Sequence, residues 1–246
     1  MSSNSILSKS GVKPKNVSVF GAKTRLHSNQ AKLQSAETIK LAGQKLTEGY
    51  SAEAERILRD AIENRNHSAN DSANLKRLLA YTLETLGRYQ EAIEVIKFYE
   101  TEENRVSLEL ETEIKVITQL AICYNNLSDY PKAVTLLKQN LQRAKDAELA
   151  HLFGRIKIAL SRVYRKLNEY PIARDHAEKA LNNFREFGKW RGMAESYQAI
   201  ATSYYQEGNS EKSLEYFDLA IKIVGERSAP FLLGKLYSDM SGAYCM

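Results

Sequence analysis

The side chains best suited to metal binding or nucleophilic catalysis in this 246-residue chain are its four histidines and two cysteines. Zinc and redox sites usually place such residues in short motifs such as HExxH or CxxC, which bring the ligands to one helix face or one turn. Cys123 and Cys245 each stand alone, and the histidines follow no such spacing: His27, His67, His151 and His176. We therefore predict no disulfide framework, no metal site and a reducing compartment.

The motifs that hold phosphates or activate nucleophiles are also missing from the sequence. The segments GVKPKN (residues 11–16) and FGAK (residues 20–23) lack the second glycine and the GK[ST] ending of a phosphate loop. No nucleophile elbow or spaced set of carboxylates is present. Cys123 lies between Ile122 and Tyr124, which favours a packing role over that of a reactive thiol. We predict a non-catalytic protein without a cofactor.

Cationic side chains follow a helical spacing in one segment, and they are Arg155, Arg162, Arg165 and Lys166. Seven and eleven residues are close to whole helical turns, so Arg155, Arg162 and Lys166 share a narrow arc, with Arg165 to the side. Guanidinium groups bind carboxylates and phosphates through paired N–H donors. Mutual repulsion along the stripe must be offset by acidic neighbours or by an anionic ligand. The stripe is thus either a site for an anionic segment or a solvated basic face.

The overall composition limits the fold class and the location. Hydrophobic residues make up 43% and charged residues 26%, as in ordinary soluble proteins. Four prolines and twelve glycines argue against a turn-rich sandwich or barrel, and long stretches of good helix formers favour an all-α fold. No apolar run approaches the roughly 18 residues that cross a bilayer, and the N-terminus lacks the apolar core of a secretory signal. We predict a cytoplasmic protein with no membrane partner.

The positive charge is concentrated at the N-terminus. Residues 1–36 carry a net charge of +6 without an acidic residue, whereas the remaining residues sum to −1. Nucleic-acid binding through the rest of the chain is therefore not expected. Residues 1–35 contain few large apolar side chains, which predicts a flexible basic tail. Three roles fit such a tail: a simple solvated extension, an electrostatic arm for an anionic partner, or an organelle transit peptide.

A pattern of about 40 residues recurs from Ala36 onward. The segments LGRYQEAIEVI, LSDYPKAVTLL, LNEYPIARDHA and EGNSEKSLEYF share a small residue at one position, and EGYSAEAERIL is an earlier copy. The spacings between these marker residues are 38, 41, 40 and 40 residues, along the series Ala54, Ala92, Ala133, Ala173 and Ser213. Five equivalent positions at nearly constant spacing predict an array of stacked repeats.

The fourth copy shows the physical basis of one repeat. Apolar residues recur with helical spacing from Ile156, and the polar segment LNEY then interrupts the pattern. A second helix begins near Tyr170, with Pro171 in its first turn, where the missing N–H costs nothing. A stripe of small residues follows, which lets two helices approach closely: Ala173, Ala177 and Ala180. Such a hairpin cannot bury its apolar face alone, so the units must stack.

These units resemble tetratricopeptide repeats (TPRs). The family places Leu, a small residue and Tyr in the first helix, Gly and Tyr at the turn, and Ala in the second helix. The fourth copy carries this pattern at Leu160, Ser161, Tyr164, Tyr170, Ala173 and Ala180. Two kinds of departure from the family pattern occur. The turn glycine is replaced by Ser128 and Asn168, and the alanine near the end of the second helix is replaced by Asn140 and Tyr99. The resemblance covers residues 36–246 and implies an all-α, right-handed superhelical solenoid of stacked antiparallel helix pairs.

The same frame divides the chain into a tail, residues 1–35, and an array, residues 36–246. The array contains repeats at about 36–66, 71–103, 108–146, 149–187 and 189–225, and a truncated sixth at 229–246. The final segment GKLYSDMSGAYCM aligns with a first helix that lacks its partner, so we expect a longer protein. We also expect this open end to expose Leu236, Met240 and Tyr244 and to favour a homodimer.

The resemblance also implies the binding surface, because the first helices of TPR repeats line an inner, concave groove. The family's groove positions select the cationic stripe, Ile158 and Thr118, and the flanking repeats add Arg77, Tyr81, Glu84, Gln198 and Gln206. Asparagine amides can clasp a peptide backbone, and arginines suit carboxylates. We therefore expect a protein or peptide partner, preferably acidic, to bind Lys115, Asn125, Asn126, Arg155, Arg162, Arg165, Lys166 and Tyr205.

Two functions fit this groove. The first is a non-catalytic protein–protein interaction scaffold that binds a peptide or helix. The alternative is an N-terminal sensory or regulatory segment of a larger signalling or transcription-regulating protein, since arrays with a 40-residue period resemble those that precede such output domains. An enzyme is disfavoured by the missing catalytic motifs.

Overall fold

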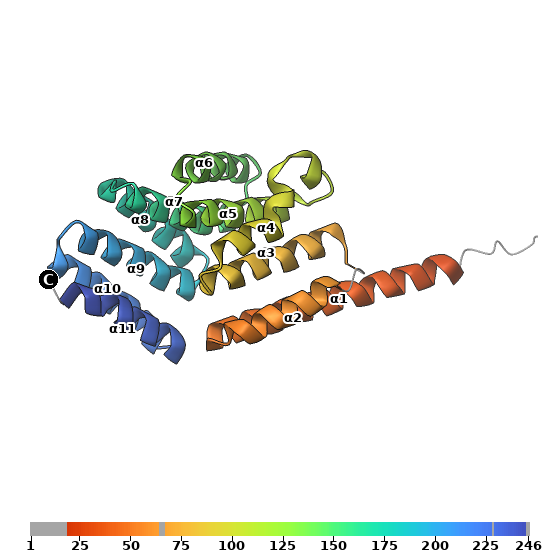
Figure 1. Ribbon diagram of the computed structural model, residues 1–246, viewed down its shortest axis with the longest axis horizontal. Coiled ribbons are helices and arrows are strands. Elements are labelled where there is room, and N and C mark those ends of the chain that lie inside the picture. The colour runs from red at the N-terminus through yellow and green to blue at the C-terminus, as the bar shows by residue number, and fades with distance from the viewer. Residues whose placement is uncertain (1–18, 64–66, 228, 245–246) are drawn as a thin grey trace, which may run out of the picture.

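The structure of the protein is a computed structural model that describes residues 19–63, 67–227 and 229–244, with side chains from residue 33 to residue 243. Within these ranges all regular secondary structure is helical, which confirms the predicted fold class (Figure 1). The α-helices are α1 (Val19–Glu48), α2 (Ser51–Glu63), α3 (Ala69–Thr85), α4 (Tyr89–Ile96), α5 (Leu110–Asn126), α6 (Tyr130–Asp146), α7 (Phe153–Lys166), α8 (Tyr170–Glu186), α9 (Trp190–Gln206), α10 (Ser210–Gly225) and α11 (Pro230–Tyr244). Three short 3₁₀ helices lie at Lys97–Glu100, Glu103–Arg105 and Ala150–Leu152.

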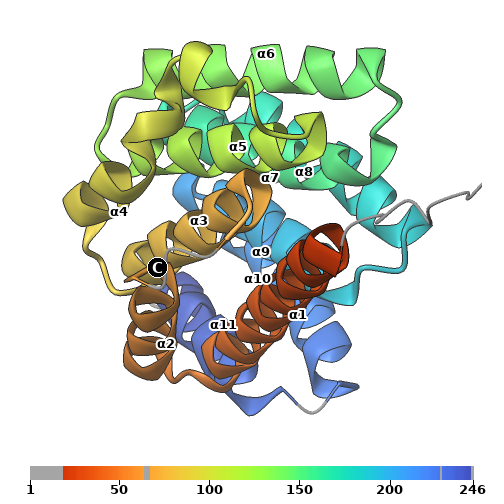
Figure 2. The same cartoon turned by 90° about the vertical axis from the view of Figure 1, so that its right-hand side faces the viewer.

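The helices pair as hairpins that stack into a curved array. From α1 to α10, each odd-numbered helix packs against the even-numbered helix that follows it, and neighbouring hairpins pack in chain order. The curvature brings α11 back beside α1 (Figure 2). At this meeting point a Cβ on Gly49 would lie 2.6 Å from a ring carbon of Phe231, and Gly49 has a φ of +91°. Only glycine satisfies both the turn and the close contact at this position.

The first helix begins earlier than the sequence analysis predicts. We expected a flexible tail through residue 35, but α1 begins at Val19, so residues 19–35 are helical. This segment contains no proline, and its C-terminal end is held by tertiary contacts. Ser35 is fully buried, and its Oγ lies 2.8 Å from Nδ1 of His67. Residues 1–18 lie outside the described residues.

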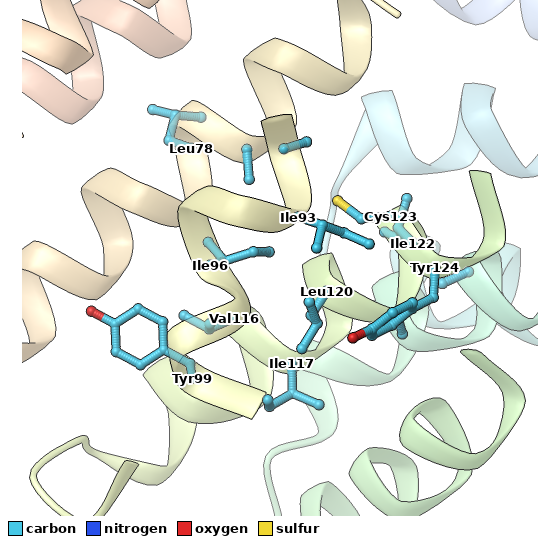
Figure 3. Packing of buried hydrophobic residues seen from close by; sticks show 14 of the residues in the cluster. Leu78, Ile93, Ile96, Tyr99, Val116, Ile117, Leu120, Ile122, Cys123 and Tyr124 are labelled. Carbon is cyan, nitrogen blue, oxygen red and sulfur yellow. The ribbon is translucent and has the colours of Figure 1, made fainter. Parts of the chain in front are cut away.

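Small and branched side chains fill the core as the repeat pattern predicts. Ala173, Ala177 and Ala180 are all fully buried, which lets α8 lie close to its neighbours. The centre of the array is filled by branched residues of α3, α4 and α5 (Figure 3). Cys123 is part of this cluster, and burial, together with the charge of Glu84, raises the pKa of its thiol to about 12. The thiol is therefore protonated and inert at neutral pH.

Departures from the family pattern have local structural causes. Asn140 is buried, and its Nδ2 donates to the carbonyl of Ile114 at 3.0 Å and to Oγ1 of Thr118 at 3.2 Å. At the position where the family has a late alanine, Asn140 thus joins α5 and α6 by hydrogen bonds. Ser128 and Asn168 take the turn glycine's left-handed conformation, with φ of +65° and +62°. Asparagine tolerates this region better than most residues, because its side chain can hydrogen-bond locally.

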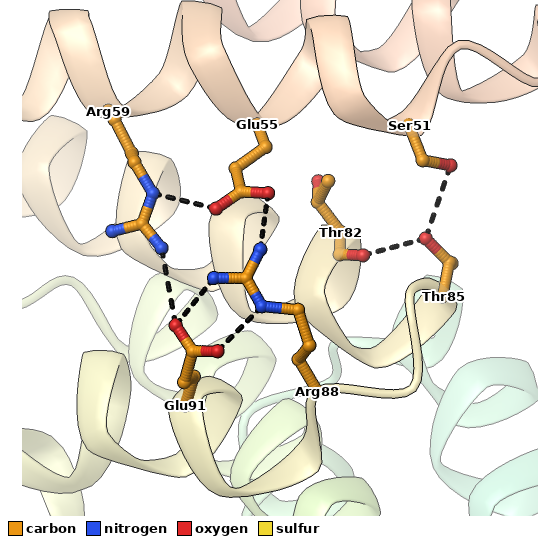
Figure 4. A network of polar contacts seen from close by, with 7 residues as sticks. All are labelled: Ser51, Glu55, Arg59, Thr82, Thr85, Arg88 and Glu91. Atoms are coloured by element: carbon orange, nitrogen blue, oxygen red, sulfur yellow. Dashed lines mark hydrogen bonds and ion pairs between the residues drawn. The ribbon is translucent and has the colours of Figure 1, made fainter.

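A charged network joins the first two hairpins (Figure 4). Glu55 on α2 accepts from Arg59 at 2.8 Å and from Arg88 at 2.7 Å. Arg88, at the beginning of α4, also donates through two nitrogens to Glu91, both at 2.6 Å. Ser51 and Thr85 lie 3.4 Å apart beside this network. These contacts align neighbouring hairpins from the solvent-exposed side, where ion pairs contribute modestly to stability.

The last helix is better covered than expected. We predicted that Leu236 and Met240 would be exposed at an open end, and this was wrong, because they are only 4% and 5% exposed. The apolar stripe of α11 packs against α10 and α9, as each earlier first helix packs against the hairpin before it. The side chain of Tyr244 lies outside the described residues. The exposed apolar residues of α11 are instead Phe231 and Tyr237.

A half-buried histidine makes the array sensitive to acid. His176 stacks on Tyr164, with ring centroids 5.4 Å apart, and its Nδ1 is buried without a hydrogen-bond partner. Burial, helped by the charge of Lys157, lowers the pKa of His176 to about 4. The unfolded chain therefore binds this proton more tightly, and stability is lost as the pH falls from the ordinary histidine pKa towards 4.

We expect protonation of His176 to lower the free energy of unfolding by about 2 kcal/mol between pH 7.5 and pH 5. Urea unfolding at both pH values measures it, with His176→Phe as the comparison, because phenylalanine keeps the ring stacking and cannot be protonated. The variant should lose about 2 kcal/mol less than the wild type on acidification. Equal losses in the two proteins would contradict the assignment to His176.

Candidate ligand-binding groove

Polar residues of the odd-numbered helices line a cavity of about 430 Å³ on the surface of the array. The walls come mainly from α3, α5, α7 and α9, the first helices of four successive hairpins, and from α11. Phe217 of α10 also lines the cavity. Six of the eight residues that the sequence analysis selects line this cavity: Asn125, Asn126, Arg162, Arg165, Lys166 and Tyr205. The stacking therefore brings residues from three repeats to one site.

The other two selected residues line a second cavity, of about 220 Å³. Lys115 and Arg155 lie in its wall, together with Arg77 of α3 and Gln119 of α5. Three cations from three different helices therefore face the same small space, and its lining contains no carboxylate. The single groove expected from the sequence is divided into two cavities.

One carboxylate ties the two cavities together. Glu195 on α9 accepts from Arg155 at 3.1 Å and also from Arg162. Burial alone would raise the pKa of Glu195, but the charges of Arg162 and Arg155 outweigh it and hold the pKa below its ordinary value. The same attraction raises the pKa of Arg155 in spite of burial. Two of the four cations in the predicted stripe therefore share one carboxylate, which offsets one of their two positive charges.

The remaining two cations of the stripe are available for a ligand. Arg165 donates to the amide oxygen of Gln206 at 3.0 Å and forms no ion pair with any described carboxylate. Lys166 is exposed and has neither a hydrogen bond nor an ion pair with any described residue. Across the cavity, Gln198 donates to Asp239 of α11. The cavity thus contains both donors for carboxylates and acceptors for amides.

Some residues chosen from the repeat frame have structural roles. Ile158 was expected in the groove, but this was wrong, because it is fully buried and packs with Ala177, Ala180 and Ile200. Position 158 packs against α8, the second helix of the same hairpin, and against α9. Thr118 is also buried, although it borders the smaller cavity. These residues stabilise the array and are not available to a peptide.

Glu195 is not among the residues predicted for the groove, although the sequence contains a signal for it. Glu195 lies 40 residues after Arg155, its ion-pair partner. Gln206 lies 41 residues after Arg165, and Asp239 lies 41 residues after Gln198. Because stacked repeats place equivalent positions side by side, a separation of one repeat period predicts such contacts.

The chemistry available at these cavities is hydrogen bonding and charge pairing. Within the side chains described, no three His, Cys, Asp or Glu residues are arranged to hold a metal ion. None of the described helices has the length and apolarity needed to cross a membrane. The arginine and lysine donors suit carboxylates, and the amides of Asn125, Asn126 and Gln198 suit peptide groups.

A comparison with protein families matches the tetratricopeptide repeat model to residues 113–186 and 154–226. These segments include most of α5 and the whole of α6 to α10. The resemblance seen in the sequence is therefore confirmed for the repeats that form most of the groove. No curated protein matches the chain in sequence.

Solved structures with the same architecture share little sequence with this chain. A STAND protein (signal transduction ATPase with numerous domains) with a tetratricopeptide repeat sensor, from Pyrococcus horikoshii, has a TM-score of 0.65 at 18% identity, over 89% of this chain and 33% of that one. PlcR of Bacillus thuringiensis, in complex with the peptide PapR7 and DNA, has a TM-score of 0.62 at 10% identity, covering 80% and 73%. A thermophilic TPR protein of Thermus thermophilus has a TM-score of 0.59 at 20% identity, covering 86% and 100%. The chain thus spans about a third of the Pyrococcus protein.

Proposed function

We propose that this chain, which carries tetratricopeptide repeats, is a non-catalytic scaffold that holds a peptide or helix of a partner protein in its groove. The observation that carries the proposal is the convergence of polar residues from successive first helices on one cavity of about 430 Å³. A cavity built from several repeats can bind several consecutive residues of an extended or helical segment. Its partner is therefore a polypeptide.

An acidic segment fits the free charges of the larger cavity. Arg165 and Lys166 have no described carboxylate partner, and both face the cavity. Arg162 is already paired with Glu195, so it contributes less attraction. Asp239 and Glu84 also line the cavity, and they favour amide or basic groups beside them. We therefore propose a partner segment with a local acidic cluster and polar neighbours, and not a uniformly acidic one.

A peptide selection tests this function. A random peptide library is displayed against the full 246-residue chain, and the enriched peptides are synthesised and titrated by fluorescence polarisation. The test variant is Arg165→Glu/Lys166→Glu, which leaves the Glu195 ion pairs in place. We expect it to weaken binding by about tenfold or more, because reversing two contacting charges costs at least about 1.4 kcal/mol.

The control carries the same change of charge elsewhere. Lys138 and Arg185 are exposed on α6 and α8 and line neither cavity. Lys138→Glu/Arg185→Glu should bind the selected peptides as the wild type does. The proposed function fails if no peptide is enriched, or if both double variants lose affinity equally.

A second proposal is that the array is a sensory segment of a larger signalling protein. Its support is the likeness to the repeat sensor of the Pyrococcus STAND protein and to PlcR, which was solved with a peptide. A sensor must change shape when its ligand binds, whereas a simple scaffold need not. Small-angle scattering with a selected peptide separates the two: a change in the radius of gyration supports the sensor, and an unchanged radius supports the scaffold.

A further inference from the structure

Arg77 on α3 is a half-buried arginine whose Nε has no partner. Its Nε is inaccessible to solvent and has no hydrogen-bond partner, and the side chain forms no ion pair with any described residue. A buried charge of this kind is costly unless an opposite charge and acceptor oxygens surround it. Arg105, which is buried in the described array, is by contrast paired with Glu113. Arg77 is therefore arranged to receive an anion.

The surroundings of Arg77 form a positively charged cavity. Arg77, Lys115 and Arg155 line the same space of about 220 Å³ between α3, α5 and α7. Lys115 is engaged by Glu111 and Arg155 by Glu195, and neither of these carboxylates belongs to the lining. Burial, with the nearby charge of Arg155, lowers the pKa of Arg77 to about 10. The guanidinium still carries its full charge at neutral pH.

The remaining wall of this cavity favours a carboxylate on an aliphatic stem. Ile114, Leu152 and Ile156 provide an apolar surface, whereas Thr118 and Gln119 add polar atoms. An acidic side chain presents methylene groups to the apolar wall and two oxygens to the arginine fork. Inorganic phosphate has no apolar part, so it would leave that wall without a contact.

We propose that the cavity between α3, α5 and α7 is a subsite for the carboxylate of a glutamate or aspartate side chain of the bound peptide, held by Arg77. This inference rests on the proposed function, because the subsite lies beside the larger cavity and shares with it the ion pairs of Glu195. A peptide that crosses both cavities would place an acidic residue at Arg77 and its next segment near Arg165.

Nuclear magnetic resonance of the Arg77 Nε–H group tests the subsite directly in the full chain. The resonance is assigned by its loss in Arg77→Met. The probe is acetyl-Gly-Glu-Gly-amide, whose only carboxylate is that of the glutamate side chain. Three other ligands are compared with it: acetyl-Gly-Gln-Gly-amide, acetyl-Gly-Gly-Gly with a free C-terminus, and inorganic phosphate. We expect a saturable shift of the resonance and a raised melting temperature with the glutamate peptide alone, at millimolar concentration.

The other probes identify the source of the anion. An equal response to the glutamine peptide overturns the proposal, since no carboxylate would then be required. A response to the free C-terminus or to phosphate that equals the response to glutamate also overturns it, because the subsite would not recognise an acidic side chain. No response to any probe overturns it as well.

Variants at Arg77 separate a binding role from a structural one. Arg77→Met should melt at a higher temperature than the wild type without ligand, because an unpaired and partly buried charge is removed. The same variant should also bind the glutamate peptide about tenfold or more weakly than the wild type. Arg77→Lys keeps the charge without the fork and should bind with intermediate affinity. A lower melting temperature for Arg77→Met, with binding retained, overturns the proposal.

The control and the peptide selection keep this inference separate from the proposed function. Lys138→Met removes one charge from exposed surface and should leave binding of the glutamate peptide unchanged. If the subsite fails while selected peptides still depend on Arg165 and Lys166, the scaffold function stands and only the inference falls. If the glutamate peptide binds at Arg77 but the library yields no peptide, the proposed function falls.

Discussion

Replacing Gly192 with valine is expected to destabilise the array by about 3 kcal/mol, because three helices meet at this glycine. A Cβ at Gly192 on α9 would lie 2.4 Å from ring carbons of Phe184 on α8. Gly154 on α7 contacts the same ring, since its Cβ would lie 2.7 Å from it. The ring is held from both sides and cannot move away, so valine forces the hairpins apart.

Urea unfolding of Gly192→Val measures this cost, and Gly43→Ala provides a matched control. Gly43 also lies within a helix, α1, but a Cβ there would meet no atom within 4 Å. Helix propensity alone should make Gly43→Ala more stable by about 0.5–1 kcal/mol. Opposite signs for the two glycines are therefore expected, and a neutral Gly192→Val would contradict the three-helix contact.

A double variant assigns the cost to Phe184. Phe184→Ala alone should lose about 3–5 kcal/mol, because a nearly buried aromatic ring is removed. In Gly192→Val/Phe184→Ala the valine occupies part of the space that the ring leaves. The combined loss should fall short of the sum of the single losses by at least about 1 kcal/mol, as for residues in direct contact. Additive losses would show that the valine acts elsewhere.

Removing the charge of Glu195 has the second large expected effect, and it acts on both stability and binding. Glu195→Gln leaves Arg155 and Arg162 without their shared carboxylate. The loss for a fully buried pair is about 3–5 kcal/mol. Because these side chains are partly exposed, solvent screening reduces it, and we expect about 2 kcal/mol. The freed arginines should also bind acidic peptides more tightly.

Two measurements check the Glu195 prediction. Unfolding in low and high salt should show that the penalty shrinks with added salt, because ions screen the unpaired arginines. The control is Asp175→Asn, which breaks an exposed pair with Lys179 and should cost no more than about 0.5 kcal/mol. The affinity for selected acidic peptides should rise in Glu195→Gln, and an unchanged or weaker affinity would show that the arginines do not contact the ligand.

The pH dependence of the same ion pairs has a defined sign. The pKa of Glu195 is depressed in the folded protein by Arg162 and Arg155. Its stabilisation is therefore present above the ordinary glutamate pKa and is lost as the pH falls through the lower, folded value. The destabilisation that arises from His176 occurs at a higher pH, as the pH falls from the ordinary histidine pKa towards about 4. The two groups therefore affect separate parts of the acid transition.

The sequence by itself determined the helix pairs, their order and the surface that faces the groove. These features depend on local patterns: the helical spacing from Ile156, the break at LNEY and the stripe of small residues that begins at Ala173. A hairpin with one apolar face has to stack, so a period of about 40 residues predicts the solenoid. The same regularity placed all eight candidate residues on cavity walls.

Only the tertiary structure decided which groups are free to act. Glu195 pairs with two of the predicted cations and offsets one of their charges. Arg77, which the sequence places only at the margin of the groove, remains without an ion pair to any described residue. Leu236 and Met240 are covered, and α1 begins at Val19. Burial and charge pairing depend on what the neighbouring repeats bring to each position. A pattern within one repeat contains no such information, although partners one period apart supply part of it.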